Sequence, residues 1–596
     1  MNYQQARQRE RVEKKISQLK RFSFWLSFIA VCVIIYDIGF ANSDITEDRL
    51  SNFYFFVFFV GAITILTRHY IRRTSLLLKV KIFDTFILFL FAVLFLIKID
   101  LIPGNTAISS FFDTMGWVYV AVIIYFIREF SNLTINFNKD FLNPAQLIIA
   151  SFLSLILLGT FLLMLPKATY EGISLIDALF TSTSAVCVTG LIVVDTGTYF
   201  TPLGQNIILI LIQLGGLGIM TFASYFSYFF RGRSSYESQI MLKDVTNTEK
   251  IGEVFHVLKK IIILTFSIEL IGAVFIFFSV KKALIPGIID RIGFSIFHSI
   301  SAFCNAGFST LKNGLYESEF KFNYPLQLII IGLFVLGGIG FPLLFNLYKF
   351  LVYYFKNQLI KIKHPKESVY IPWVLNINSR IVLLTTAILL ITGTVLFYFF
   401  EYDNTLAEHS PLGKLVVSLF GAATPRTAGF NSVDMTALNF STIMIVFILM
   451  WIGASPGSTG GGIKTTTFAI ATLNFMSIAK GKDRIEIFRR EISDLSVRRA
   501  FAIISLSLVV IGTAIFLIAS FDSEMTLLSI AFECFSAYST VGLSLGITAL
   551  LSGPSKLVLI VTMFIGRVSM LTLLIAFLRR VKHLNYKFPK EEILIN

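Results

Sequence analysis

Four short stretches, each centred on a glycine, have the residue types and spacing needed to act on an ion. The glycines are Gly190, Gly307, Gly429 and Gly542, separated by 117, 122 and 113 residues. Glycine permits backbone conformations that other residues avoid and lets the backbone approach a ligand closely. Rings of backbone carbonyls can replace the hydration shell of a potassium-sized cation. Four related loops on one chain therefore predict a ring of carbonyls around one axis, which is the arrangement of an ion pore.

The alternative is that four unrelated glycines cap four helices. Single glycine caps are common, but here the contexts match: Ser184–Leu191 is echoed by Ser301–Phe308, Ala423–Phe430 and Ser536–Leu543. Such a repeat at near-equal spacing favours the pore.

The elements that must position these loops form a repeat of about 115 residues, with an apolar helix, a short re-entrant helix, the glycine loop and a second apolar helix. The repeats are predicted at 143–240, 250–360, 375–485 and 490–585. Their second helices are predicted at 204–230, 325–352, 440–478 and 555–581. The short helices cannot span a bilayer, so the irregular backbone beside them must be covered by protein or line a water-filled cavity.

Composition indicates a polytopic membrane protein. Hydrophobic residues make up 55% of the chain and charged residues 15%, and mean hydropathy is +0.76, whereas soluble domains carry about 25% charged residues. Four more apolar segments precede the repeats, at 22–41, 52–68, 82–99 and 113–128. They predict an accessory four-helix transmembrane domain over 22–140, which follows a basic arm at 1–21. Together with the repeats, the chain is expected to have twelve spanning helices. No buried charge pattern in these four segments indicates a role in transport.

The net charge of +15 follows the topology. Basic loops alternate with acidic or neutral ones, which by the positive-inside rule places the basic loops, both termini and the 586–596 tail in the cytoplasm. A nucleic-acid partner is therefore not expected. The four cysteines have no spacing typical of a metal site, and the N-terminal segment is too long and lacks the cleavage site of a signal peptide.

A glycine-rich stretch, Gly453–Gly462, interrupts the second helix of the third repeat. Glycines and Pro456 break a helix, so the stretch is expected to line the cavity beside the glycine loops. A nucleotide-binding P-loop is the rival interpretation, but that motif needs glycine directly before its lysine, and Ile463 separates Gly462 from Lys464. Arg567 lies within the last apolar helix, where a charge indicates a functional role unless it snorkels to an interface.

Several of these stretches resemble the Trk/Ktr/HKT superfamily of potassium transporters, nearest the Ktr-type membrane (pore) subunit. They are Asp177–Leu191, Phe303–Phe308, Arg426–Asn431, Gly453–Thr465, Leu214–Gly218 and Gly337–Pro342. The resemblance covers about 143–585. It implies an all-α membrane protein with four fused membrane-pore-membrane repeats and pseudo-fourfold symmetry, and potassium uptake with Rb⁺ as surrogate.

The resemblance also implies site residues and partners. The ion-binding selectivity filter is expected at Val188, Thr189, Gly190, Asn305, Ala306, Gly307, Thr427, Ala428, Gly429, Thr540, Val541 and Gly542. The gate is expected at Gly453, Ser455, Pro456, Gly457, Ser458, Thr459, Gly460, Gly461, Gly462, Lys464 and Arg567. K⁺ is the expected ion at the filter carbonyls, with no cofactor in this chain. The resemblance implies a homodimer in the cell membrane that rests on a separate cytoplasmic nucleotide-binding (RCK-type) ring. Na⁺-dependent uptake is implied as well, although the sequence shows no sodium site and leaves channel and symporter open.

Two other functions would need different residues. A sodium-conducting transporter of the same fold would have serine at the first filter position, where this chain has Gly190. A membrane enzyme would need a nucleotide site or paired carboxylates in the membrane, and the sequence shows neither. Glu533, Asp177 and His298, on the short helices, are expected to cap or pack.

Overall fold

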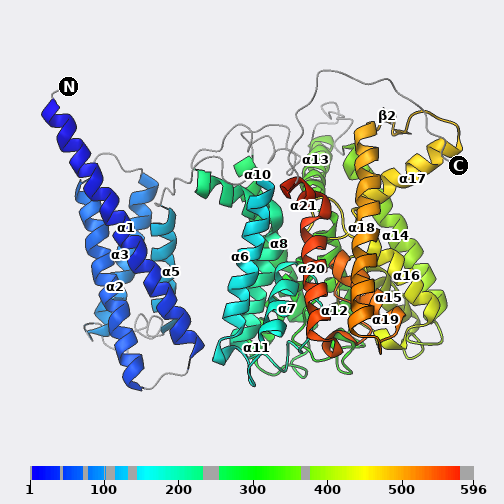
Figure 1. The fold of residues 1–596 in the computed structure, drawn as a ribbon, viewed down its shortest axis with the longest axis horizontal. Helices are drawn as coiled ribbons and strands as arrows, with labels where there is room; N and C mark the ends of the chain where they lie inside the picture. Colours follow the sequence, from blue (N-terminus) through cyan, green and yellow to red (C-terminus); the bar gives the residue numbers. More distant parts are fainter. Residues whose placement is uncertain are drawn as a thin grey trace.

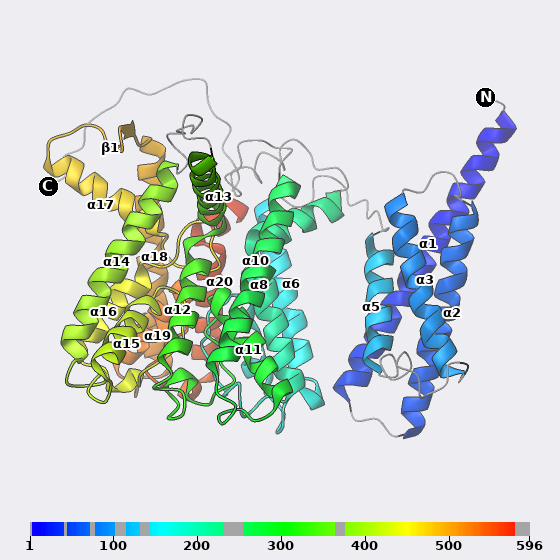
Figure 2. The same ribbon diagram turned by 180° about the vertical axis from the view of Figure 1, so that it is seen from behind.

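The computed structural model describes residues 3–40, 44–71, 78–99, 101, 115–131, 144–231, 254–363 and 376–577. A four-helix unit at the N-terminal end stands beside a larger bundle that contains the four repeats (Figures 1 and 2). The expected helical membrane fold is confirmed. The predicted 586–596 tail, and the predicted domain and repeat boundaries at 140, 143, 240, 250, 375 and 585, lie outside the described residues.

The N-terminal unit corresponds to the four apolar segments predicted ahead of the repeats. Its helices are α1 (Tyr3–Gly39), α2 (Asp44–Ile71), α3 (Leu78–Lys98) and α5 (Met115–Ser131). Aromatic side chains fill its centre, where the rings of Phe58 and Phe91 stack with centroids 4.5 Å apart. The end of α1 meets the first repeat, with Gly39 beside the side chain of Leu165.

A network of four buried charges joins α2, α3 and α5. Arg128 donates from Nε and Nη2 to the two Asp84 oxygens at 2.6 and 2.7 Å. Arg68 donates to both Glu129 oxygens at 2.9 and 2.5 Å. The most exposed of the four, Arg128, is only 6% exposed. The sequence analysis missed this network because the paired residues lie 44 and 61 positions apart, so no short pattern reveals them.

We expect Arg128→Met to destabilise the N-terminal unit. The substitution leaves the Asp84 carboxylate buried without the guanidinium that binds both its oxygens, and breaking a buried ion pair costs about 3–5 kcal/mol. Thermal unfolding of the full chain in detergent measures the loss, with the exposed Arg49→Met as control. Equal unfolding temperatures for the two variants would contradict the structural role of the network.

Each repeat contains a first helix, a short helix and an interrupted second helix. The first helices are α6 (Pro144–Leu163), α10 (Val254–Ser279), α14 (Ile377–Glu401) and α18 (Asp494–Phe521). The short helices are α7 (Leu175–Val186), α11 (Ile288–Phe303), α15 (Pro411–Ala423) and α19 (Leu527–Ser539). The second helices are α8 (Pro202–Arg231), α12 (Tyr324–Ile339) with α13 (Phe341–Lys363), α16 (Phe440–Trp451) with α17 (Thr465–Ala479), and α20 (Gly553–Val568) with α21 (Met570–Phe577). Short connections include the 3₁₀ turns η1 (Pro166–Ala168), η3 (Gly314–Tyr316), η5 (Met435–Ala437) and η6 (Thr548–Leu550), and a hairpin of β1 (Glu486–Ile487) and β2 (Arg490–Glu491).

The second helix is interrupted in every repeat, whereas the sequence analysis expected a break only in the third. The first repeat kinks at Gly218, with φ 76°. In the second, α12 and α13 meet at 107° around Gly340, with φ 95°. In the fourth, α20 and α21 meet at 87° around Ser569, with φ 75°. A positive φ cannot continue a right-handed helix, so these residues end it.

These breaks change the predicted number of spans. Among the described residues, seven helices are long and apolar enough to cross a membrane, or nine when each of two bent pairs counts as one span. The expected number was twelve. The other three are α5, which is 17 residues long, and the second helices of the first and third repeats, whose pieces are each shorter than a bilayer-spanning helix.

Candidate ion pathway

The four glycine loops (residues 188–191, 305–308, 427–430 and 540–543) directly follow the short helices. Side-chain caps fix where three of these helices begin: Ser174 accepts a hydrogen bond from the Asp177 N–H, Ser410 from Gly413 and Thr526 from Ser529. The C-terminal end of a helix carries partial negative charge. Each glycine loop therefore begins at a helix end that favours a cation.

All four glycine loops share one backbone conformation. The residue two places before each glycine has a positive φ, which is uncommon outside glycine. These values are Val188 57°, Asn305 61°, Thr427 75° and Thr540 51°. The glycines follow at Gly190 90°, Gly307 71°, Gly429 77° and Gly542 90°. Only seven non-glycine residues of the described chain have positive φ, so four of them at matching positions mark the loops as equivalent.

The glycine loops close into a ring in chain order. A Cβ built on each glycine would run into the carbonyl of the residue before the glycine in the next loop. The pairs are Gly190 with Ala306 O, Gly307 with Ala428 O, Gly429 with Val541 O, and Gly542 with Thr189 O. The fourth loop thus returns to the first. The structure therefore brings the four loops that carry the twelve residues singled out from the sequence into one closed ring.

Hydroxyl groups on the short helices hold the glycine loops in place. The side chains of Ser184, Ser301 and Thr424 each donate to the carbonyl of the residue after the loop glycine, at 2.7, 2.7 and 2.6 Å. In the first and fourth loops, the glycine N–H donates to Ser184 and Ser536 respectively, at 3.1 Å. The sequence analysis did not single out these hydroxyls, although one precedes each glycine by five or six residues.

The 453–462 loop, between α16 and α17, packs directly against the ring. The Gly461 N–H donates to Thr540 Oγ1 at 2.9 Å. The Thr459 hydroxyl lies 3.1 Å from the amide of Asn305, and a Cβ on Gly460 would overlap Thr427 Oγ1. The loop therefore contacts three of the four glycine loops.

The same loop is tied to the interrupted second helices. The Ser455 N–H donates to Gly338 O at 2.9 Å, and the Phe341 N–H donates to Gly457 O at 3.0 Å, across the break between α12 and α13. Lys464 donates from Nζ to Gly460 O at 2.7 Å. The residues proposed from the sequence in this region, from Gly453 to Lys464, therefore form one connected segment beside the ring.

Arg567 connects this loop to the first repeat. Its guanidinium donates from Nη1 to Thr459 O and from Nη2 to Gly215 O, the latter at 2.5 Å. The side chain is only 6% exposed, so it does not snorkel to an interface. The helix ends one residue later, at Val568, with Ser569 as its C-cap.

Three titratable residues of the short helices take structural roles. Asp177 accepts a hydrogen bond from the hydroxyl of the N-cap residue Ser174 at 2.8 Å and pairs with Lys556 at 2.7 Å. Glu533 accepts from the Thr548 hydroxyl at 3.0 Å, and His298 is fully buried against the Phe294 carbonyl, 2.9 Å away. These contacts match the capping and packing roles predicted for the three residues.

Glu269 is a buried carboxylate that the sequence analysis missed. It accepts from Gln213 Nε2 at 3.1 Å and lies 3.7 Å from Cys304 Sγ, directly behind the second glycine loop. The only signal in the sequence is one acidic residue inside the apolar run of α10.

Comparison with known proteins places the chain among cation transporters. It matches the family model described as TrkH, cation transport protein, over residues 118–585. It is 37% identical over 457 residues to the Ktr system potassium uptake protein B of Vibrio alginolyticus, covering 75% of this chain and 94% of that protein. It is 36% identical over 464 residues to the potassium/sodium uptake protein NtpJ of Enterococcus hirae, covering 76% and 97%.

The fold is similar to that of the potassium transporter TrkH from Vibrio parahaemolyticus. The TM-score is 0.58 at 17% sequence identity, covering 84% of this chain and 97% of that one. The family match begins at residue 118, inside α5, and not at 143 as the sequence resemblance indicated. The last helix of the N-terminal unit therefore lies within the matched region.

Proposed function

Because the chain belongs to the TrkH cation transport family, as its resemblance to Ktr-type membrane subunits indicated, we propose that it takes up potassium ions across the cell membrane through the ring of glycine loops. The closed ring, in which each glycine faces a carbonyl of the next loop, carries the proposal. Two relatives named as potassium uptake proteins, at 37% and 36% identity, support K⁺ as the ion.

In this proposal, the ring is a selectivity filter. Carbonyls of Val188–Gly190, Asn305–Gly307, Thr427–Gly429 and Thr540–Gly542 replace the water that K⁺ loses on entry. The hydroxyls of Ser184 and Ser301 each bond to a carbonyl of their own loop and so fix the conformation of two of the loops. Helix ends beside all four loops add negative potential for the cation.

We further propose that the 453–462 loop is the gate. It occupies the side of the ring where Asn305 and Thr540 lie, and the basic loops assign that side to the cytoplasm. Lys464 and Arg567 place positive charge there and repel a leaving cation while the loop is closed. Both termini are cytoplasmic in this topology.

A separate cytoplasmic regulator would move this gate. We propose a homodimer on a nucleotide-binding, RCK-type ring. The supporting feature is the 480–499 segment after α17, which carries a hairpin with exposed Arg489 and Arg490. Relatives at 37% and 36% identity are named as parts of Ktr systems.

Rb⁺ uptake into proteoliposomes of the purified chain tests the function. We expect Rb⁺ to accumulate, with competition by external K⁺ and stimulation by external Na⁺. If Rb⁺ uptake is the same with and without external Na⁺, the chain is a regulated channel and its uptake does not depend on Na⁺. Absence of uptake both by the wild type and by a folded variant with a shortened 453–462 loop would contradict potassium transport, because the second sample removes the need for the regulator.

A further inference from the structure

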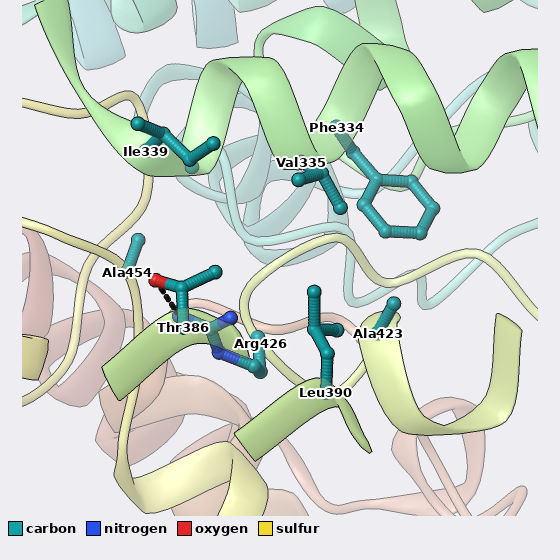
Figure 3. A pocket seen from close by; sticks show the side chains of 9 residues that line it. Phe334, Val335, Ile339, Thr386, Leu390, Ala423, Arg426 and Ala454 are labelled. Carbon is teal, nitrogen blue, oxygen red and sulfur yellow. Dashed lines mark hydrogen bonds between the residues drawn. The ribbon is translucent and has the colours of Figure 1, made fainter. Parts of the chain in front are cut away.

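A small cavity lies between the second and third repeats, beside the third glycine loop. Figure 3 shows Arg426 among side chains that come from several elements around it. Its lining includes Val335 and Ile339 of α12, Thr386 and Leu390 of α14, and Ala454 of the 453–462 loop. The cavity volume is about 10 Å³, close to what one water molecule needs.

Arg426 brings an uncompensated positive charge to this cavity. The side chain is 8% exposed. One hydrogen bond of its guanidinium is described, from Nη2 to Thr386 Oγ1 at a long 3.4 Å, and Nε has no acceptor. Within the described ranges, no carboxylate oxygen lies within 4.0 Å of the guanidinium. An isolated buried charge is expensive, so this arginine needs an anion.

The other buried arginines show which hydrogen-bond acceptors a buried guanidinium has elsewhere in this structure. Arg68 and Arg128 pair with carboxylates at 2.5 to 2.9 Å, and Arg567 donates to two backbone carbonyls. Arg426 has neither kind of partner in the described part of the chain. Its surroundings are mainly apolar apart from the Thr386 hydroxyl.

We propose that this cavity binds a small monovalent anion of the halide class, with chloride as the ligand. Free guanidinium N–H groups donate to the anion, and the Thr386 hydroxyl is placed to do the same. The apolar remainder of the lining suits a weakly hydrated ion. Phosphate, or the carboxylate head of a lipid with its chain, is too large for the space.

The site lies where its charge affects ion passage. Arg426 directly precedes Thr427 of the ring, and Ala454 belongs to the 453–462 loop. A bound anion neutralises a positive charge that would otherwise raise the energy of K⁺ in the ring. This effect on rate rests on the proposed transport function, whereas binding of the anion does not.

Thermal unfolding of the full chain in detergent tests binding directly. K⁺ concentration and ionic strength are held constant while gluconate is exchanged for chloride or bromide. A ligand of the folded state stabilises it saturably, so we expect a halide-dependent rise in unfolding temperature that Arg426→Gln removes and Thr386→Val weakens. Arg291→Gln, which loses a guanidinium stacked 4.0 Å over Phe277 and away from the cavity, should keep the rise.

Equal unfolding temperatures of the wild type in gluconate and halide would overturn the site, as would a halide response that survives in Arg426→Gln. If Arg426→Gln does not fold, bromide anomalous scattering from wild-type crystals decides: a peak beside Arg426 supports the site, and water alone there overturns it. Rb⁺ uptake is then compared in chloride and gluconate. We expect uptake to be several-fold slower in gluconate. If halide binds but Rb⁺ uptake is equally fast in chloride and gluconate, the proposed effect on transport is overturned, whereas the anion site stands.

Discussion

Gly307→Ala is expected to lower the preference of the purified chain for Rb⁺ over Na⁺ by about tenfold or more. A Cβ there would lie 2.9 Å from Ala428 O and 2.9 Å from the Gly429 Cα, at φ +71°. Strain in such a conformation is of order 1–3 kcal/mol, and about 1.4 kcal/mol is a factor of ten in an equilibrium constant. The strain is relieved by moving the carbonyls that would coordinate the ion. Competition of Na⁺ and K⁺ against Rb⁺ uptake measures the change.

Gly332→Ala is the matched control. Gly332 lies in the same repeat, on α12, and its Cβ would meet nothing within 4 Å, so selectivity and unfolding temperature should be retained. Gly190→Ser should act in the same direction as Gly307→Ala, because its Cβ would overlap Ala306 O. Folded Gly307→Ala protein with unchanged affinity and selectivity would refute the filter assignment.

Deleting residues 457–461 is expected to raise Rb⁺ uptake about thirtyfold or more when no regulator is present. The deletion removes the hydrogen bonds from Gly461 to Thr540 and from Thr459 to Asn305, as well as the carbonyl that Arg567 binds. At about 1 kcal/mol for each hydrogen bond, the closed position loses roughly 2–3 kcal/mol, which is about a 30- to 150-fold shift toward the open position.

Arg567→Gln should raise uptake in the same direction but by less, because it leaves the hydrogen bonds of the loop to Thr540 and Asn305 in place. Gly512→Ala, on α18 with nothing within 4 Å of its Cβ, serves as the neutral control. A deletion variant that is folded, binds Rb⁺ and yet transports none would argue against a gate and for a loop that holds the ring together.

The ring could be anticipated from the sequence because its signal is local and repeated. Each glycine loop keeps its motif within about eight residues, and four copies reinforce one another. The glycine-rich 453–462 loop was found for the same reason. The break at Gly340 was missed because a glycine within an apolar helix is ambiguous until its neighbours are known. In the structure, a Cβ on Gly340 would lie only 2.7 Å from the carbonyl oxygen of Pro456.

The charged sites could not be predicted because their meaning depends on distant partners. Arg128 and Arg426 are both arginines beside apolar segments. The first meets Asp84, 44 positions away, and becomes part of a stable network. Among the residues that the structure describes, the guanidinium of the second meets only Thr386, 40 positions away, and is left with an excess charge. Only the packing of helices from different repeats distinguishes the two.

The most direct test of ion coordination by the ring is to locate Rb⁺ by anomalous scattering in crystals of the chain grown in a rubidium salt. We expect Rb⁺ on the axis between Gly190, Gly307, Gly429 and Gly542, with the peak lost or reduced in Gly307→Ala. Rb⁺ bound elsewhere in the bundle, with none inside the ring, would contradict a filter built from the four glycine loops.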